Sequence, residues 1–166
     1  MRAARPEEAA TLRAIELDAA RRFEALGLDF LSGVPPTSLE LLRGAIEAGH
    51  VLVVAERERV LGFALVEPLG GALHLAELDV RADFSGQGLG RRLVEAVCDL
   101  ARSRGYPRVT LTTFRDVPFN APWYARLGFR VLDEGELEPH LAGLRAHERL
   151  AGLDALARVV MERRLE

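Results

Sequence analysis

The feature that most constrains the fold of this chain is the glycine-rich segment 80–93, which joins an apolar strand pattern to an amphipathic helix pattern. Its glycines stand at alternate positions directly before the helix: Gly86, Gly88 and Gly90. Glycine leaves backbone N–H groups unshielded, and a helix N-terminus favours an anion through those donors and the helix dipole. Arg91 and Arg92 add positive charge just inside the helix. The segment therefore predicts a cradle for an anion, typically a phosphate group.

Two common phosphate-binding patterns do not fit this segment. A Walker A loop needs Gly-Lys-Ser/Thr, whereas all 22 basic residues of the chain are arginine. A dinucleotide fingerprint needs a third glycine three residues after the second, and the two possible registers place Arg91 or Leu93 there. Binding of a nucleoside triphosphate or of NAD is therefore disfavoured.

A third pattern matches. Residues 85–90 resemble the acyl-CoA loop Q/R-x-x-G-x-G/A of the GCN5-related N-acetyltransferase (GNAT) superfamily, with Ser85 where glutamine or arginine is usual. This departure costs one side-chain contact and leaves the amides intact. The resemblance implies that acetyl-CoA (coenzyme A) is the cofactor and that backbone amides of the loop, with Arg91 or Arg92 in support, hold its pyrophosphate. The loop residues so assigned are Ser85, Gly86, Gln87, Gly88, Leu89 and Gly90.

A second signature lies downstream. Residues 120–129 resemble the family's Asn followed by a short helix that ends Tyr-x-x-Leu-Gly-Phe. Pro122 suits the first turn of this helix, and Gly128 suits the position after its end. Two signatures in this order, with a strand between them, identify the chain as a member of the superfamily over about residues 50–132.

The strand before the loop carries a candidate general base. Alternation puts Glu77 and Asp79 on the same face as Leu73 and Leu75. A carboxylate in an apolar strand is costly unless it is paired or used, and partial burial would raise its pKa towards that of a working base. The resemblance implies that Glu77 deprotonates the amine; the alternative is a structural carboxylate paired with an arginine. The Asp79 side chain is expected to be structural or solvated at the strand end.

The remaining site assignments follow from the resemblance. Tyr124 would protonate the departing CoA sulfur, or would only pack under Leu127 and Phe129. Asn120 would bind the cofactor arm, but it stands four residues before Tyr124 where seven is usual, so a turn or N-cap role remains open. Trp123 would contact the cofactor, line the acceptor pocket or pack. The oxyanion donor would be a backbone N–H among Leu78, Asp79 and Val80.

Other candidates are expected to be structural. Cys98 is expected to be a packed thiol and His74 a strand histidine without a ligand role. The acidic run 133–138 is expected to be a solvated loop, with attraction of a cationic amine as the alternative. The spacing of cysteine and histidine does not fit a metal site.

Composition sets the outer bounds. A chain of 166 residues that is 49% apolar suits one domain over residues 1–166. Its segments lack the ~18–20 apolar residues of a membrane span, and its first residues lack a signal-peptide pattern, so a cytoplasmic location is expected. A net charge of −3 argues against nucleic acid as a partner.

Periodicity predicts an α/β (α+β) chain with a mixed sheet flanked by helices. The resemblance implies that this is the acyl-CoA N-acyltransferase (GNAT) fold, with a mostly antiparallel sheet of six to seven strands. The expected helices are 6–23, 38–48 and 88–104, with a short one around Tyr124. The expected strands are 50–55, 60–68, 72–80, 108–114, 129–132 and 155–164, the first two joined by a hairpin at 56–59. Residues 141–150 are expected to be a polar segment without a stated structure.

Together these observations predict an N-acetyltransferase that moves an acetyl group to a primary amine, on a small molecule or a peptide N-terminus. The amine would attack directly in a ternary complex, without an acyl-enzyme. The alternative is a non-catalytic acyl-CoA-binding regulatory domain, which would need neither Glu77 nor Tyr124. A homodimer formed through the final strand is possible by analogy with the family.

Overall fold

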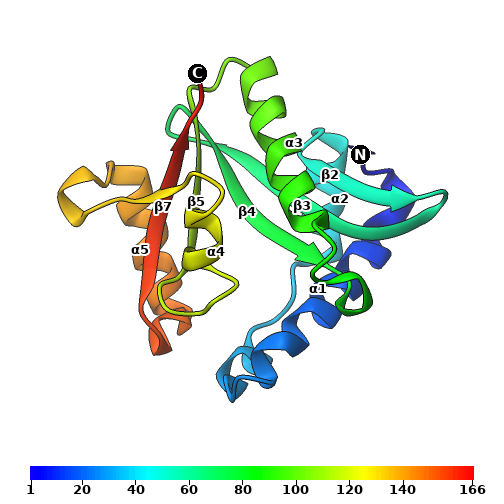
Figure 1. Ribbon diagram of the computed structural model, residues 1–166, viewed down its shortest axis with the longest axis horizontal. Coiled ribbons are helices and arrows are strands. Elements are labelled where there is room, and N and C mark those ends of the chain that lie inside the picture. The colour runs from blue at the N-terminus through cyan, green and yellow to red at the C-terminus, as the bar shows by residue number, and fades with distance from the viewer. The chain divides into compact units, whose positions relative to one another are not determined.

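The structure is a computed structural model whose backbone is described at residues 1–166 and whose side chains are described at residues 1–31 and 33–166. The strands are β1 (Arg2–Ala3), β2 (Val51–Glu56), β3 (Arg59–Leu69), β4 (Ala72–Val80), β5 (Arg108–Phe114), β6 (Arg130–Val131) and β7 (Arg158–Arg164). The α-helices are α1 (Ala9–Glu24), α2 (Leu39–Glu47), α3 (Leu89–Ser103), α4 (Ala121–Ala125) and α5 (Pro139–Leu150). Figure 1 shows these elements in chain order.

The predicted mixed sheet is confirmed. Hydrogen bonds order its seven strands as β1-β2-β3-β4-β5-β7-β6. The pairs β1–β2, β2–β3, β5–β7 and β6–β7 are antiparallel, whereas β4 and β5 are parallel, with Leu73 opposite Val109. The chain divides into two compact units: residues 1–66 with 77–97, and residues 67–76 with 98–166.

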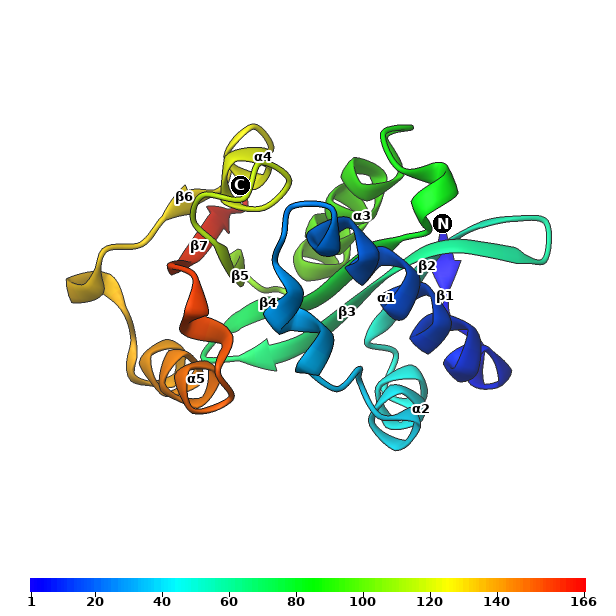
Figure 2. The ribbon, with the colours of Figure 1, turned by 90° about the horizontal axis from the view of Figure 1, so that it is seen from below.

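The first unit is built on the hairpin of β2 and β3. Helices α1 and α2 lie on one face of these strands, and the first part of α3 lies on the other (Figure 2). The helical spacing of apolar residues explains the first contact, because the predicted stripe Leu12 and Ile15 of α1 packs with Leu42 of α2 against Phe63. Ser38 caps α2 as predicted, since its hydroxyl accepts a hydrogen bond from the N–H of Leu41 at 3.1 Å.

The second unit is built on β5 and β7, with α4 and α5 on opposite faces of these strands (Figure 2). Its small apolar cluster consists of Leu132, Leu141 and Val160, with Leu69 and Leu137 packed around it. Cys98 is buried and, as the one cysteine of the chain, forms no disulfide within it, in agreement with its prediction as a packed thiol.

The segment 141–150, which was not assigned a helix, lies within α5. Its inward face carries Leu141, Arg145 and Glu148, which follow helical spacing but include only one apolar residue. Arg145 donates to Glu148, and Arg158 donates to Glu148 at 3.1 Å. A helix whose buried face is held by ion pairs has no apolar stripe, so its sequence reads as a polar segment.

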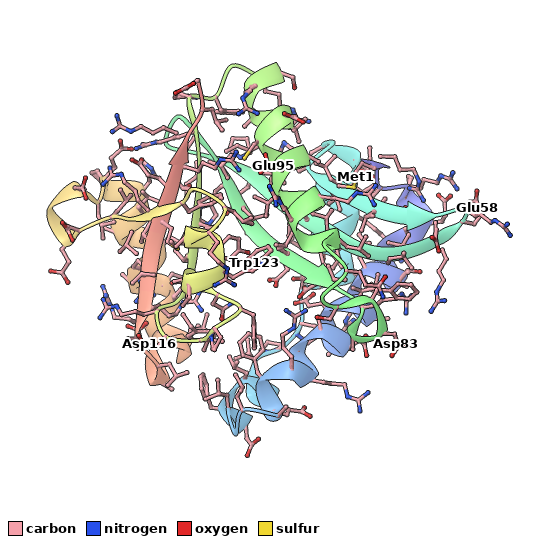
Figure 3. The ribbon with its side chains drawn as sticks, viewed as in Figure 1. Met1, Glu58, Asp83, Glu95, Asp116 and Trp123 are labelled. Carbon is pink, nitrogen blue, oxygen red and sulfur yellow. The ribbon has the colours of Figure 1, made fainter. Side chains whose placement is uncertain are left out.

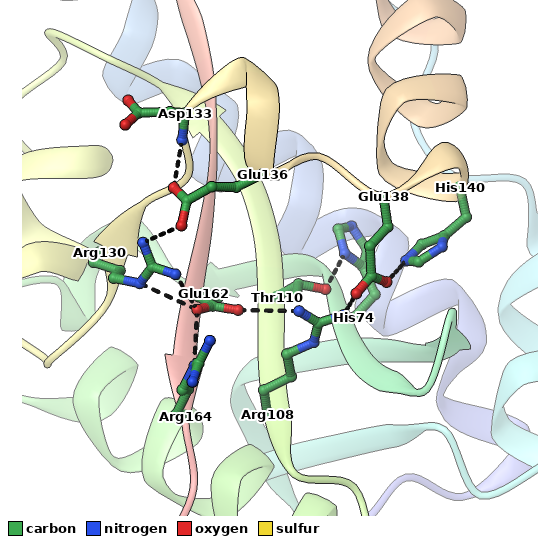
Figure 4. A network of polar contacts seen from close by, with 10 residues as sticks. All are labelled: His74, Arg108, Thr110, Arg130, Asp133, Glu136, Glu138, His140, Glu162 and Arg164. Atoms are coloured by element: carbon green, nitrogen blue, oxygen red, sulfur yellow. Dashed lines mark hydrogen bonds and ion pairs between the residues drawn. The ribbon is translucent and has the colours of Figure 1, made fainter.

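Residues 133–138 form a largely exposed segment around the 3-10 turn Glu134–Glu136, as predicted, and two of its carboxylates also form ion pairs. Glu136 and Glu138 form ion pairs with Arg130 at 2.8 Å and with Arg108 at 2.6 Å (Figure 4). Both arginines also contact Glu162 of β7, which is 1% exposed. Burial alone would raise the pKa of Glu162, but hydrogen bonds from Arg130, Arg164 and Arg108 outweigh it and lower that pKa.

Smaller differences occur at element ends. The hairpin turn is only Arg57 and Glu58, because Glu56 pairs with Arg59. The last strand begins at Arg158 instead of residue 155, after a 3-10 turn at Leu153–Ala155. The short strand β1 was not predicted. Along the described chain, no helix is long and apolar enough to cross a membrane.

Candidate functional site

The predicted site residues fall into two groups, one in each compact unit, and each group is described by itself. The first unit holds the carboxyl end of β4, the glycine loop and the start of α3. The second unit holds α4 with the residues predicted to contact the acyl carrier: Asn120, Trp123 and Tyr124.

Backbone conformation explains two of the three loop glycines. Gly86 and Gly88 have φ of 77° and 79°, in the left-handed region that favours glycine. No described atom lies within 4 Å of a Cβ built at either position, so conformation and not space requires glycine there. Ser85 and Gln87 are exposed, as are Arg91 and Arg92 in the first turn of α3. The first N–H groups of this 15-residue helix have no partner within the helix and open onto the loop.

Contacts within the first unit fix the start of the loop. Arg81 donates to Val60 O from its Nε at 2.8 Å, and its backbone N–H donates to Leu61 O at 2.8 Å. The N–H of Ala82 donates to Asp18 Oδ2 on α1 at 2.7 Å. The ring of Phe84 lies 5.0 Å below the Arg59 guanidinium. The exposed Asp83 is in the same 3-10 turn (Figure 3).

Two carboxyl groups lie together at the carboxyl end of β4. Glu77 and Asp79 are half-buried and share one face of the strand, and their side chains are within hydrogen-bonding reach of each other. Burial raises the pKa of Asp79 well above its ordinary value, and Glu77 and then Glu16 of α1 raise it further, whereas Arg22 lowers it. Of the two roles expected for the Asp79 side chain, structural or solvated at the strand end, the buried Oδ2 fits the structural one.

The backbone at Asp79 is closely packed from the side of β3. A Cβ built on Gly62 would lie 2.6 Å from the carbonyl oxygen of Asp79 and 3.1 Å from Val80 Cγ2. Only glycine allows this approach. Val80 is buried and Leu78 is half-buried. The strand end that carries the carboxyl pair is thus held by backbone packing.

In the second unit, Asn120 occupies the N-cap position of α4. Its carbonyl oxygen accepts from the N–H groups of Trp123 and Tyr124 at 2.9 and 3.0 Å. Its side chain does not cap the helix, and Nδ2 donates to Phe119 O at 3.4 Å. Oδ1 is buried, and no described group donates to it. The turn role left open for this residue is therefore carried by its backbone, and its side-chain oxygen remains available to a donor.

Aromatic contacts hold the Tyr124 ring. It meets Phe129 edge-on with ring centroids 5.6 Å apart and Trp123 with centroids 4.8 Å apart. Tyr124 is 8% exposed. Gly128, with φ of 86°, ends the turn after α4, as its sequence position predicts. The packing predicted as an alternative for Tyr124 is present, and packing of the ring is compatible with an acid role of the residue.

Sequence reasoning missed three residues that support the first group: Glu16, Asp18 and Gly62. Glu16 accepts a hydrogen bond from the N–H of Thr37 at 3.0 Å, and its charge raises the pKa of Asp79. Asp18 is 64 positions from Ala82, so no local pattern could pair them. Among the described side chains, no group of three or more His, Cys, Asp or Glu is placed to hold a metal ion.

Comparison with known proteins identifies the family. The family model described as Acetyltransferase (GNAT) family matches residues 19–129. Glucosamine 6-phosphate N-acetyltransferase 1 of Oryza sativa subsp. japonica is 34% identical over 139 residues, which are 74% of this chain and 82% of that protein. The corresponding enzyme of Trypanosoma brucei brucei is 29% identical over 129 residues, 69% of this chain and 84% of that protein.

The fold has solved counterparts. PaiA N-acetyltransferase from Thermoplasma acidophilum, crystallised with coenzyme A, superposes with a TM-score of 0.69 at 14% identity and covers 99% of this chain and 97% of that one. This similarity concerns the fold, and the sequence matches concern the family. The chain belongs to the acetyltransferase (GNAT) family.

Proposed function

We propose that this acetyltransferase moves an acetyl group from acetyl-CoA to a primary amine by direct attack in a ternary complex. The observation that carries the proposal is the carboxyl pair at the end of β4, which stands directly before a left-handed glycine loop and the N-terminus of α3. The proposed base and the proposed anion site therefore follow one another along the chain, within the first unit. Acetyl-CoA supplies the activated thioester.

The glycine loop fits the pyrophosphate of coenzyme A. Left-handed Gly86 and Gly88 keep side chains away from the backbone, and the first N–H groups of α3 need partners. The exposed Arg91 and Arg92 add positive charge. In this proposal the amides of residues 85–90 hold the pyrophosphate, and the two arginines supply long-range attraction and not a fixed geometry.

Glu77 acts as the general base. An amine is an ammonium ion at neutral pH, so it must lose a proton before it attacks. Glu77 is half-buried, and one of its contacts is with the carboxyl group of Asp79. The negative charges of Glu16 and Glu77 attract the ammonium form, and Glu77 takes its proton. The backbone N–H groups of Leu78, Asp79 and Val80 are the candidates for stabilising the oxyanion.

Helix α4 supplies the second set of groups. The hydroxyl of Tyr124 donates a proton to the departing sulfur, and the contacts with Phe129 and Trp123 keep the ring in one orientation. The buried Oδ1 of Asn120, which no described group reaches, is a suitable acceptor for an amide N–H of the pantetheine arm. Trp123 is half-buried and offers an apolar surface to the same arm.

Thiol release from acetyl-CoA tests the function. The panel contains glucosamine 6-phosphate, because that amine is named for a relative 34% identical to this chain, together with diamines, aminoglycosides and peptides with free N-termini. We expect amine-dependent release with at least one class. Calorimetry with coenzyme A runs in parallel. Tight binding of coenzyme A without release on any amine would contradict the proposal and support a non-catalytic acyl-CoA-binding domain.

A further inference from the structure

The carboxyl pair of β4 contains one group that the proposed mechanism does not use. Asp79 lies two residues after Glu77 on the same face of the strand, within hydrogen-bonding reach of it. Two carboxylates cannot hydrogen-bond to each other unless one of them carries a proton. A hydrogen bond between the two side chains therefore needs a proton on one of them.

The surroundings of Asp79 favour its protonated form. Its Oδ2 is buried, and no donor among the described side chains or the backbone reaches it. An ionised carboxylate without hydrogen bonds in a buried position is costly. The charged groups around it are Glu77 on its own strand and Glu16 and Arg22 on α1, so two negative groups face one positive group. Burial, Glu77 and Glu16 all raise the pKa of Asp79. Arg22 lowers this pKa, but its effect is smaller than each of the other three.

The strand end cannot relax this arrangement easily. Backbone packing at Gly62 fixes the carbonyl of Asp79, with only 2.6 Å to a built Cβ. The N–H of Arg81, two residues on, is hydrogen-bonded to Leu61 O at 2.8 Å. The Asp79 side chain is thus presented to Glu77 from a rigid backbone.

We propose that Asp79 is a positioning residue whose protonated carboxyl donates a hydrogen bond to the Glu77 carboxylate and holds it ready to accept the proton of the amine. This inference rests on the proposed role of Glu77. In the transfer, one N–H bond of the ammonium breaks, its proton goes to Glu77, and the freed electron pair of the nitrogen forms the bond to the acyl carbon. The C–S bond then breaks, and the sulfur leaves as a thiol with a proton from Tyr124, which the second proton lost by the nitrogen replaces. Asp79 keeps its own proton throughout.

Two substitutions separate this role from a merely structural one. Asp79→Asn keeps a neutral donor of the same shape, so kcat and the acid limb of the pH profile are expected to stay within twofold and about 0.3 pH unit of wild type. Asp79→Ala removes the donor, so kcat is expected to fall about tenfold and the acid limb to move up by about one pH unit, because the Glu77 anion loses a hydrogen bond. KM for acetyl-CoA is expected to be unchanged in both.

An ionised Asp79 would give the two variants a pH profile different from the expected one. If Asp79 were ionised, both variants would remove a negative charge beside Glu77, and the acid limb would move down by a similar amount in each. That result would overturn the inference.

A measurement that does not depend on activity supports the test. In protein labelled with carbon-13 at its side-chain carboxyls, the Asp79 signal is assigned by its loss in Asp79→Asn and the Glu77 signal by its loss in Glu77→Gln. We expect Asp79 to show the chemical shift of a protonated carboxyl at pH 7. A chemical shift that shows an ionised Asp79 would overturn this inference and leave the role of Glu77 standing. A protonated Asp79 together with an unchanged kcat in Glu77→Gln would overturn the base role of Glu77, and the positioning role of Asp79 with it.

Discussion

At the scale of single residues, the proposed proton carriers Glu77 and Tyr124 are distinct from the residues that hold them in place. Tyr124 packs against two aromatic rings. The side chain of Asn120 does not cap its helix, and its buried Oδ1 has no described donor. Types and positions of these residues were predictable, because the short helix and its glycine have a local pattern. The raised pKa of Asp79 was not predictable, since it comes first from burial and then from neighbours that include Glu16, which is 63 positions away in sequence and belongs to another element.

Replacement of Tyr124 by phenylalanine tests the acid role. We expect kcat to fall about 10²-fold or more with little change in KM for acetyl-CoA, because only the proton donor is removed. Steady-state thiol release measures both constants. Tyr106→Phe changes the other tyrosine of the chain and is expected to leave them unaltered. An unchanged kcat in Tyr124→Phe would refute the acid assignment.

At the scale of elements, regular patterns were predicted well and polar ones were not. The bounds 72–80 and 108–114 predicted for two strands are those of β4 and β5, because an alternating or continuous apolar run between turn residues is a clear signal. Helix α5 was missed, because Arg145 and Glu148 stand on its buried face. Ion pairs between distant residues replace the apolar stripe there, and such pairs have no signature in a local window.

The link from α1 to the glycine loop gives an element-scale prediction. Asp18→Ala removes the acceptor of the Ala82 N–H and leaves the start of the loop less constrained. We expect KM for acetyl-CoA to rise about three- to tenfold, within the range of one ordinary intramolecular hydrogen bond, while kcat changes little. Asp83→Ala, at an exposed position of the same turn, is the matched control. Equal KM values in the two variants would show that the Asp18 contact does not order the loop.

At the scale of the whole molecule, buried ionisable groups make stability depend on pH. Burial lowers the pKa of His74 to about 4, against an opposing effect of Glu148 and with a further lowering by His140. The ring accepts or donates a hydrogen bond at Thr110 Oγ1, 3.0 Å from Nδ1 (Figure 4). The sequence placed His74 correctly in a strand, but two groups that act on its pKa, Glu148 and His140, belong to α5, which was not predicted.

The lowered pKa of His74 makes the folded protein less stable as the pH falls. Between about pH 6.5 and 4 the unfolded chain binds a proton at His74 and the folded chain does not, so stability falls as pH falls through this window. We expect His74 to contribute a loss of about 2 kcal/mol in the free energy of unfolding between pH 7 and pH 5. Urea unfolding at the two pH values measures it. His74→Leu should lack this component, and His147→Leu, at an exposed position, should retain it; the same pH dependence in all three proteins would contradict the account.

The measurement that tests the central claim most directly is kcat for Glu77→Gln, in the thiol-release assay with an accepted amine. Glutamine has nearly the same shape but cannot take a proton, so kcat is expected to fall about 10²- to 10⁴-fold, with KM for acetyl-CoA unchanged. Glu67→Gln, at an exposed position of β3, is the control and should behave as wild type. A Glu77→Gln variant that keeps the wild-type kcat across the pH range would contradict the claim that the carboxyl end of β4 is the catalytic centre.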